Sequence, residues 1–235
     1  MAQETEQETQ DEVWKPKTKL GRKVARGEIT SIREAMNHDR EIMKTEIVDQ
    51  LVDLEEEVIL IGGTPGKGGG KRRTVSKRTC RMHKSGERYN TKSMAALGNH
   101  NGIIGLGMGE ADDTRAAIED ANRKAKLNLI EVTSGCGSWE CSCGTDHSVP
   151  FKVTGKSGSV EAELKPAPKG IGIAASDDVK KVLELAGFED VWVESRGQTR
   201  TRENLIKAVF NALEKIGEYK GGEKRSEERR VRERV

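Results

Sequence analysis

Residues 79–108 read TCRMHKSGERYNTKSMAALGNHNGIIGLGM, and this stretch predicts three consecutive antiparallel strands. Residues 79–83 and 88–97 alternate polar and apolar side chains on either side of a short turn, which is typical of a β-hairpin. The pair Asn101 and Gly102 predicts a second tight turn, because both central positions of a type I′ turn need positive φ. A third strand is expected directly after it.

Helical patterns lie on both sides of these strands. Residues 31–54 carry apolar side chains at helical spacing, with acids on the other face. Residues 112–129 begin with an aspartate that can cap a helix and continue with an apolar stripe of Ile118, Ala121, Ala125 and Leu129. The order of helix, three antiparallel strands and helix predicts a sheet with helices on one face, which is an α+β fold.

A second module is expected from residue 148 onward. Its patterns predict strands, then a helix that ends at Gly187, then a strand and a last helix. The expected strands lie near residues 149–154, 159–164, 171–175 and 191–193, and the last helix covers about 204–216. This β-β-β-α-β-α order predicts a small two-layer module, so the whole chain falls in the α+β class.

The chain is therefore divided into five segments, of which the two modules are the largest. The terminal segments are polar, and the segment between the modules is rich in Cys and Gly. The segments are an acidic tail with a basic N-terminal segment at 1–30, the first module at 31–134 with a Gly/Lys/Arg-rich loop at 62–78, the connector at 135–147, the second module at 148–217 and a charged tail at 218–235.

The distribution of charge points to a nucleic-acid partner. The net charge is only +2, but Lys67 to Lys92 contains ten Lys or Arg and a single acid, whereas Asp39 to Glu57 contains eight acids. A solvated face usually mixes both signs, so a nearly pure cationic segment favours binding to a phosphate backbone. Aromatic residues make up only 3% of the chain, which disfavours base stacking and leaves shape and phosphate recognition of folded RNA.

Other functional classes are disfavoured. No stretch approaches the ~20 apolar residues of a membrane span, and no signal segment opens the chain, so we expect a cytoplasmic protein without a membrane partner. No nucleophile and base pair or carboxylate cluster stands in a context that supports catalysis. We therefore expect no enzymatic activity.

Two glycine motifs imitate nucleotide-binding loops. The stretch from Gly62 to Lys67 has the wrong spacing for a phosphate-binding loop. Gly170, Gly172 and Ala175 fit the dinucleotide pattern G-x-G-x-x-A, but Asp177 and Asp178 stand where a pyrophosphate would bind. We interpret these glycines as positions that allow close backbone packing.

The cysteines allow a metal site. Cys136, Cys141, Cys143 and His147 offer four soft ligands in a glycine-rich segment, so structural zinc is one hypothesis and packed or solvent-facing thiols are the other. Cys80 has no such neighbours and is expected to be a small core residue. We expect no required cofactor, and structural zinc is possible.

Several stretches resemble the family of the universal small-subunit ribosomal protein five. In the first module they are Arg81 to Arg88, Ala95 to Gly102 and Gly105 to Gly109; in the second they are Gly155 to Val160, Pro166 to Gly172 and Thr199 to Asn204. The stretches Trp14 to Gly21 and Gly135 to Cys141 resemble the archaeal branch of that family. The segment Gly62 to Lys77 departs from the family pattern as an insertion, which we expect to be an added rRNA-grasping extension.

The resemblance implies a structural component of the small ribosomal subunit. It implies a first module with the order of a double-stranded-RNA-binding domain, and binding to small-subunit rRNA near the mRNA entry channel and the decoding region. It further implies a contribution to subunit assembly and translational accuracy, and ribosomal proteins three, four and eight as neighbours. We expect no homo-oligomer. A free regulator that binds double-stranded RNA is the alternative.

The candidate RNA contacts are cations of the basic N-terminal segment, the hairpin, the loop and the second module. They are Lys19, Arg22, Lys23, Lys67, Lys71, Arg72, Arg73, Lys77, Arg78, Arg81, His83, Lys84, Arg88, Lys92, Lys152, Lys156, Lys169, Arg196, Arg200 and Arg202.

Overall fold

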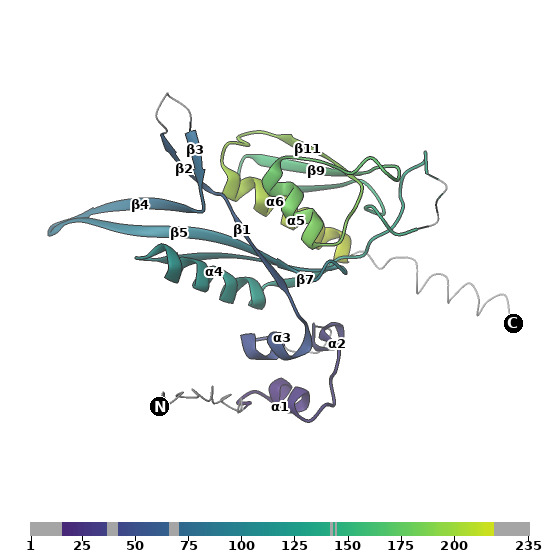
Figure 1. The fold of residues 1–235 in the computed structure, drawn as a ribbon, viewed down its shortest axis with the longest axis horizontal. Helices are drawn as coiled ribbons and strands as arrows, with labels where there is room; N and C mark the ends of the chain where they lie inside the picture. Colours follow the sequence, from purple (N-terminus) through teal and green to yellow (C-terminus); the bar gives the residue numbers. More distant parts are fainter. Residues whose placement is uncertain (1–15, 37–41, 66–70, 142, 144, 219–235) are drawn as a thin grey trace, which may run out of the picture. The chain divides into compact units, whose positions relative to one another are not determined.

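The computed structural model describes residues 16–36, 42–65, 71–141, 143 and 145–218 (Figure 1). Lys67, the expected acidic tail and nearly all of the charged C-terminal tail lie outside the described residues. The chain divides into two compact units, with the boundary between Val52 and Asp53. The expected α+β class is confirmed, because the second unit combines helices with several antiparallel sheets.

The first unit contains three short helices, α1 (Lys19–Ala25), α2 (Ile32–Met36) and α3 (Thr45–Leu51). The prediction of one helix over residues 31–54 is wrong, because residues 42–44 are not helical and the last helix ends at Leu51. One straight helix of that length would extend about 36 Å and could not fold back on itself. The shorter helices allow Leu20, Ala35 and Ile47 to meet in one small core.

The first sheet of the second unit has five strands. The three expected strands are β4 (Ser76–His83), β5 (Gly86–Gly98) and β6 (Ile103–Ala111), and their antiparallel pairing is confirmed. Two further strands complete this sheet. The apolar residues Val58 to Ile61 predict a short strand, which the structure places slightly earlier as β1 (Glu55–Ile59), paired with β5. The sequence does not predict β7 (Leu129–Glu131), which pairs with β6.

The strands β1 and β4 lie end to end along the same edge of β5. Ile59 pairs with Met94 and Ser76 pairs with the preceding residue, Ser93, so β5 keeps one continuous register across the break. The chain between them forms a separate hairpin of β2 (Gly62–Pro65) and β3 (Lys71–Thr74). The expectation of an unstructured loop at 62–78 is therefore wrong for these strands, since backbone pairing needs no side-chain packing.

The run of acids Glu55 to Glu57 is typical of a solvated helix end, but in the structure it belongs to strand β1. Each acid of β1 has a polar partner in the same unit: Glu55 contacts His100, Glu56 accepts from Asn122, and Glu57 pairs with Lys181.

Helix α4 (Thr114–Leu127) covers one face of the first sheet through a close approach of small residues (Figure 1). A Cβ atom added at Gly107 of β6 would lie 2.1 Å from the backbone oxygen of Ala121, so only glycine fits there. The buried stripe of α4 is Ala117, Ala121 and Ala125. The expected place of Ile118 in that stripe is wrong, because the small alanines are the residues that face the glycines of β6.

The second module has the expected β-β-β-α-β-α order. Its elements are β8 (Val153–Ser157), β9 (Val160–Pro166), β10 (Ile173–Ala174), α5 (Asp177–Leu185), β11 (Val191–Arg196) and α6 (Arg202–Glu218). The sheet order is β10-β11-β9-β8, with β10 parallel to β11 and the other pairs antiparallel.

The two larger sheets of the second unit share one apolar core. Met94 and Ile104 of the first sheet belong to the same buried cluster as Leu164, Leu183 and Ile206 of the second module. Helices α5 and α6 lie between the two sheets, whereas α4 lies on the outer face of the first sheet (Figure 1). The first sheet is therefore covered on both faces where β5 and β6 are buried.

The turn between β5 and β6 differs from the prediction. Positive φ occurs at His100 (54°) and Gly102 (81°) and not at Asn101, so the type I′ turn at Asn101 and Gly102 is wrong. The turn is shaped by its contact with the end of α5: the amide of His100 donates to Leu185 O at 3.0 Å, and that of Gly102 donates to Ala186 O at 3.1 Å. These bonds satisfy carbonyl groups at the helix end.

The His100 ring fastens the same turn to two other elements. Its Nδ1 lies 2.7 Å from Glu184 O, and its Nε2 lies 2.7 Å from Glu55 Oε2. The bond to the Glu55 carboxylate and the bond to the Glu184 carbonyl both raise the pKa of His100 above its ordinary value of 6.5. Protonated His100 therefore ties β1, the turn and α5 together.

We predict that the His100→Gln substitution reduces the pH dependence of stability. Because the pKa of His100 is raised in the folded protein, its contribution is fully present below about pH 6.5 and is lost as the pH rises through the folded value. Urea unfolding at pH 6 and pH 8 should show a larger loss of unfolding free energy for the parent protein than for the variant. An equal loss in both proteins would show that the ring bonds do not stabilise the turn.

Candidate nucleic-acid interface and cysteine cluster

The β4–β5 hairpin forms a basic arm, defined here as residues 76–90, that extends beyond α4 (Figure 1). Residues 81–90 are all exposed, whereas β5 becomes buried from Thr91 onward except for the half-buried Lys92. One continuous strand thus anchors in the core and carries the arm. Apart from Lys84 in the two-residue turn, the cations of the arm are consequently held on a paired backbone.

Cations face each other across the arm. Arg81 pairs in register with Arg88, and Lys77 pairs with Lys92. Like charges in directly opposite positions destabilise a hairpin, unless counterions lie between them. Among the residues that the structure describes, no carboxylate forms an ion pair with Arg81, Lys84 or Arg88. These three cations are therefore free to bind an external anion.

Tyr89 contacts two other side chains of the arm, Arg78 and Glu87. The guanidinium of Arg78 lies 3.9 Å from the centre of the Tyr89 ring, which is a cation–π contact. The Tyr89 hydroxyl donates to Glu87, and this hydrogen bond raises the pKa of Tyr89. The single acid of the arm is thus engaged by a tyrosine and does not neutralise the free arginines.

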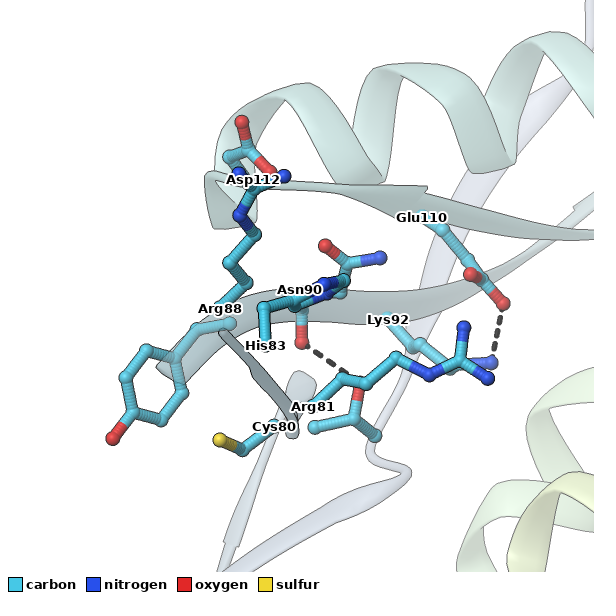
Figure 2. Close-up of a pocket in the computed structure, with 10 residues that line it drawn as sticks. Cys80, Arg81, His83, Arg88, Asn90, Lys92, Glu110 and Asp112 are labelled. Atoms are coloured by element: carbon cyan, nitrogen blue, oxygen red, sulfur yellow. Dashed lines mark hydrogen bonds and ion pairs between the residues drawn. The ribbon is translucent and has the colours of Figure 1, made fainter. Parts of the chain in front are cut away.

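An open hollow of about 880 Å³ lies between the arm and the end of β6 (Figure 2). Lys92 pairs with Glu110 at its edge, and Figure 2 shows the Arg81 guanidinium pointing toward that pair. The lining residues are Thr79, Cys80, Arg81, His83, Arg88, Tyr89, Asn90, Lys92, Glu110 and Asp112. The predicted contacts Arg81, His83, Arg88 and Lys92 are brought together here.

Cys80 lies in the same hollow and is exposed. The prediction of a small core residue is wrong at this position. Cys80 pairs with Tyr89 on the part of the hairpin that leaves the core, so neither face of the strand is covered there.

The predicted contacts outside the arm, together with Lys77 of the arm, fall into two groups. Several are exposed: Lys19 and Arg22 on α1, Arg72 and Arg73 on β3, and Lys169 and Arg200 in loops of the second module. Lys23 is half-buried on α1, and the side chain of Lys71 is not described.

The other group is already engaged by acids of the protein. Lys152 lies 2.6 Å from Glu163, Lys156 lies 2.8 Å from Glu161, Arg196 lies 2.7 Å from Glu194, Lys77 lies 3.1 Å from Glu203, and Arg202 pairs with Asp178. Lys165 and Arg196 lower the pKa of Glu194 to about 2. These cations are therefore already paired within the protein and are less available to an external anion.

The four expected metal ligands meet in one place. The ligand atoms of Cys136, Cys141, Cys143 and His147 all lie within 4.8 Å of one another. The sulfur atoms of Cys136 and Cys143 are 3.5 Å apart, and the Cys141 sulfur is 3.6 Å from His147 Nε2. With Zn–S distances of about 2.3 Å, a tetrahedral zinc ion separates its ligands by about 3.8 Å. The donor set and its spacing therefore fit zinc.

His147 is held in place by a buried carboxylate. His147 is buried, and its Nδ1 lies 2.9 Å from Asp190 Oδ2, which leaves Nε2 toward the cysteines. The other oxygen of Asp190 accepts from the amides of Gly170, at 3.0 Å, and Gly172, at 2.7 Å. A carboxylate behind a histidine is the usual support of a metal-binding imidazole.

The role of these two glycines differs from the sequence interpretation. No heavy atom lies within 4 Å of a Cβ added at Gly170 or Gly172, so close packing is not the reason for glycine. Both residues have positive φ, of 90° and 77°, and this conformation aims their amides at Asp190. Sequence reasoning missed Asp190, since no spacing pattern links it to a histidine 43 residues earlier.

The protein has an α+β fold with an exposed basic hairpin. This combination is typical of the class of proteins that bind nucleic acid through its phosphates. The family models for ribosomal protein S5 match residues 71–133, as its N-terminal domain, and residues 155–227, as its C-terminal domain. The chain belongs to the ribosomal protein S5 family, of the archaeal type.

Relatives match most of the chain. Three of them, each called small ribosomal subunit protein uS5, come from archaea. The protein of Haloarcula marismortui is 46% identical over 93% of this chain and 96% of its own length. That of Methanothermobacter thermautotrophicus is 46% identical over 91% and 92%, and that of Nanoarchaeum equitans is 48% identical over 87% and 88%. The family is structural and not enzymatic, which confirms the expectation of no catalytic activity.

Neither family model covers the cysteine cluster or the first unit. The cluster lies between the two matched ranges, and the matched N-terminal domain begins at Lys71, after β2. No helix among the described residues is long and apolar enough to span a membrane.

We predict that substituting Arg81, Lys84 or Arg88 by Ala weakens RNA binding in a salt-dependent way. Each lost phosphate contact should reduce the slope of log K against log salt by about 0.9. Fluorescence anisotropy with a labelled fragment of archaeal small-subunit rRNA measures this slope. The control is Arg115→Ala on α4, where a fully solvated arginine pairs with Glu119. Slopes that match the parent protein in all three arm variants would exclude the arm as the interface.

Proposed function

We propose that the protein is a structural component of the small ribosomal subunit that binds small-subunit rRNA through its basic arm. The observation that carries this proposal is the set of unneutralised cations, Arg81, Lys84 and Arg88, on a hairpin whose second strand is anchored in the core. Membership of the S5 family supports it, because the relatives are named as proteins of that subunit. Its place of action is then the cytoplasmic ribosome.

The finer assignments are part of the same proposal and rest on the family resemblance. They are a position near the mRNA entry channel and the decoding region, a contribution to assembly and translational accuracy, and ribosomal proteins three, four and eight as neighbours. The first module is proposed to act as a double-stranded-RNA-binding domain at 31–134, joined through the connector at 135–147 to the module at 148–217. The exposed Lys19, Arg22, Arg72, Arg73, Lys169 and Arg200 are proposed as additional phosphate contacts.

We further propose that Cys136, Cys141, Cys143 and His147 hold a structural zinc ion. A closed set of four protein ligands leaves no position for a reacting water, so the ion would act in folding and not in catalysis. His147 is buried and its carbonyl accepts from the amides of Glu189 and Asp190, at 3.0 and 3.1 Å. Zinc would thus fasten the connector to the second module.

Metal analysis tests the zinc proposal. We expect about one zinc per chain in protein purified without chelator, and Cys141→Ser should lose most of it together with several degrees of melting temperature. Cys80→Ser is the matched control, since Cys80 is exposed and lies outside the cluster. Metal-free protein with an unchanged melting temperature would leave the cysteines as ordinary thiols.

Sedimentation tests the ribosomal role. A tagged copy of the chain, expressed in an archaeal host, should travel with small subunits on a sucrose gradient at low magnesium. A triple variant with Arg81, Lys84 and Arg88 changed to Ala should shift toward the top of the gradient, because three phosphate contacts are lost. A parent protein found only in the free fractions would instead support a free regulator of double-stranded RNA.

A further inference from the structure

A smaller pocket lies between the second module and the inserted β2–β3 hairpin. It has a volume of about 260 Å³ and lies where the N-terminal ends of α5 and α6 meet β11 and the inserted β2–β3 hairpin. Val179, Val193 and Leu205 line it together with Arg73, Ser176, Ser195, Thr199, Arg200 and Arg202. Three arginines and three hydroxyl groups therefore surround an apolar floor.

The arginines differ in how they are held. Arg73 and Arg200 are exposed, and neither forms an ion pair with a carboxylate in the part of the chain that the structure describes. Arg202 is largely buried and pairs through Nη1 with Asp178, whose side chain is 5% exposed. A guanidinium has five N–H donors, so Arg202 keeps donors beyond those used by Asp178. The pocket thus combines one fixed arginine with two that can move onto a ligand.

The acids near the pocket do not neutralise the positive charge of Arg73 and Arg200. Asp178 is neutralised by Arg202, and Glu203 is neutralised by Lys77 at 3.1 Å. Asp177 is exposed in the first turn of α5 but does not line the pocket. The unpaired charge that faces the cavity is therefore that of Arg73 and Arg200.

Hydroxyl groups complete a donor set for an oxyanion. Ser176 is the N-cap residue of α5, yet its side chain makes no capping bond to the helix. Ser195 and Thr199 stand beside it on the lining. Planar guanidinium groups with nearby hydroxyl donors match the oxygens of a phosphate group. The volume is below the range of drug-sized ligands and suits one such group with part of its sugar.

We propose that this pocket binds a single phosphate group, with Arg73 and Arg200 closing on it and Arg202 as the fixed donor. The inference rests on the proposed ribosomal function for the source of the ligand, a backbone phosphate of rRNA, with free inorganic phosphate as the other source of the same chemistry. Arg73 belongs to the hairpin inserted between β1 and β4, so binding would draw that hairpin to the second module.

The test combines two probes with the full-length protein. The first is a titration of the ¹⁵N-labelled protein with inorganic phosphate in a low-salt chloride buffer, followed at the amides of Ser176, Thr199 and Arg200. The second is the affinity for archaeal small-subunit rRNA as a function of salt. Both are repeated with Arg200→Gln and with Arg115→Gln, a control that removes an equal charge from α4.

We expect phosphate to shift these amides in the parent and control proteins but not in Arg200→Gln. We also expect Arg200→Gln to bind rRNA roughly tenfold more weakly, with a salt slope smaller by about 0.9. Amide shifts that are lost in Arg200→Gln, with rRNA affinity equal to the parent, support a site for free phosphate.

Absence of amide shifts together with unchanged rRNA affinity and slope in Arg200→Gln would overturn the inference. That result is distinguishable from failure of the proposed function, in which the parent protein itself would not bind rRNA.

Discussion

The pairing of β5 with three other strands is the constraint on which the rest of the second unit depends. Its thirteen residues pair with β4, β1 and β6, and the strand passes from full exposure at Gly86 to full burial at Leu97. A strand fixed at its buried end cannot move its exposed end freely. The cations of the arm are therefore presented at defined positions, which lowers the conformational entropy lost when they bind.

Burial of that anchor requires cover on both faces of the first sheet. Glycines on β6 have no side chain, so the backbone of α4 packs directly against the backbone of β6. On the other face of the sheet, Met94 and Ile104 pack in the core that the first sheet shares with the second module. The turn that follows β5 then bonds to the end of α5 through His100 and Gly102. The second module thus completes the support of the arm, even though it lies later in the sequence.

The parts predicted from sequence were those fixed by local periodicity. The strands β4, β5 and β6 and the helices α5 and α6 follow the alternation or helical spacing of their own residues. The parts missed depend on distant partners. Glu55 to Glu57 resemble a solvated run until their partners His100, Asn122 and Lys181 are known. The apolar residues Val58 to Ile61 indicate a strand, but nothing in them indicates that it pairs with β5.

The candidate sites divide in the same way. The metal-ligand set could be named from residue type and proximity in sequence, but Asp190 could not, because two glycine amides and a histidine reach it from other segments. Likewise, the positions of the cations can be read from the sequence, but their ion-pair partners cannot. Lys152, Lys156, Arg196 and Arg202 carry the same formal charge as Arg81, yet carboxylates of the protein engage them.

A cryo-electron microscopy map of the small subunit that contains this protein is the most direct measurement of the central claim. The account predicts that the turn of the arm, Lys84 to Gly86, and the side chains of Arg81 and Arg88 lie against rRNA phosphates. A map in which the arm projects into solvent, or packs only on another protein, would contradict it.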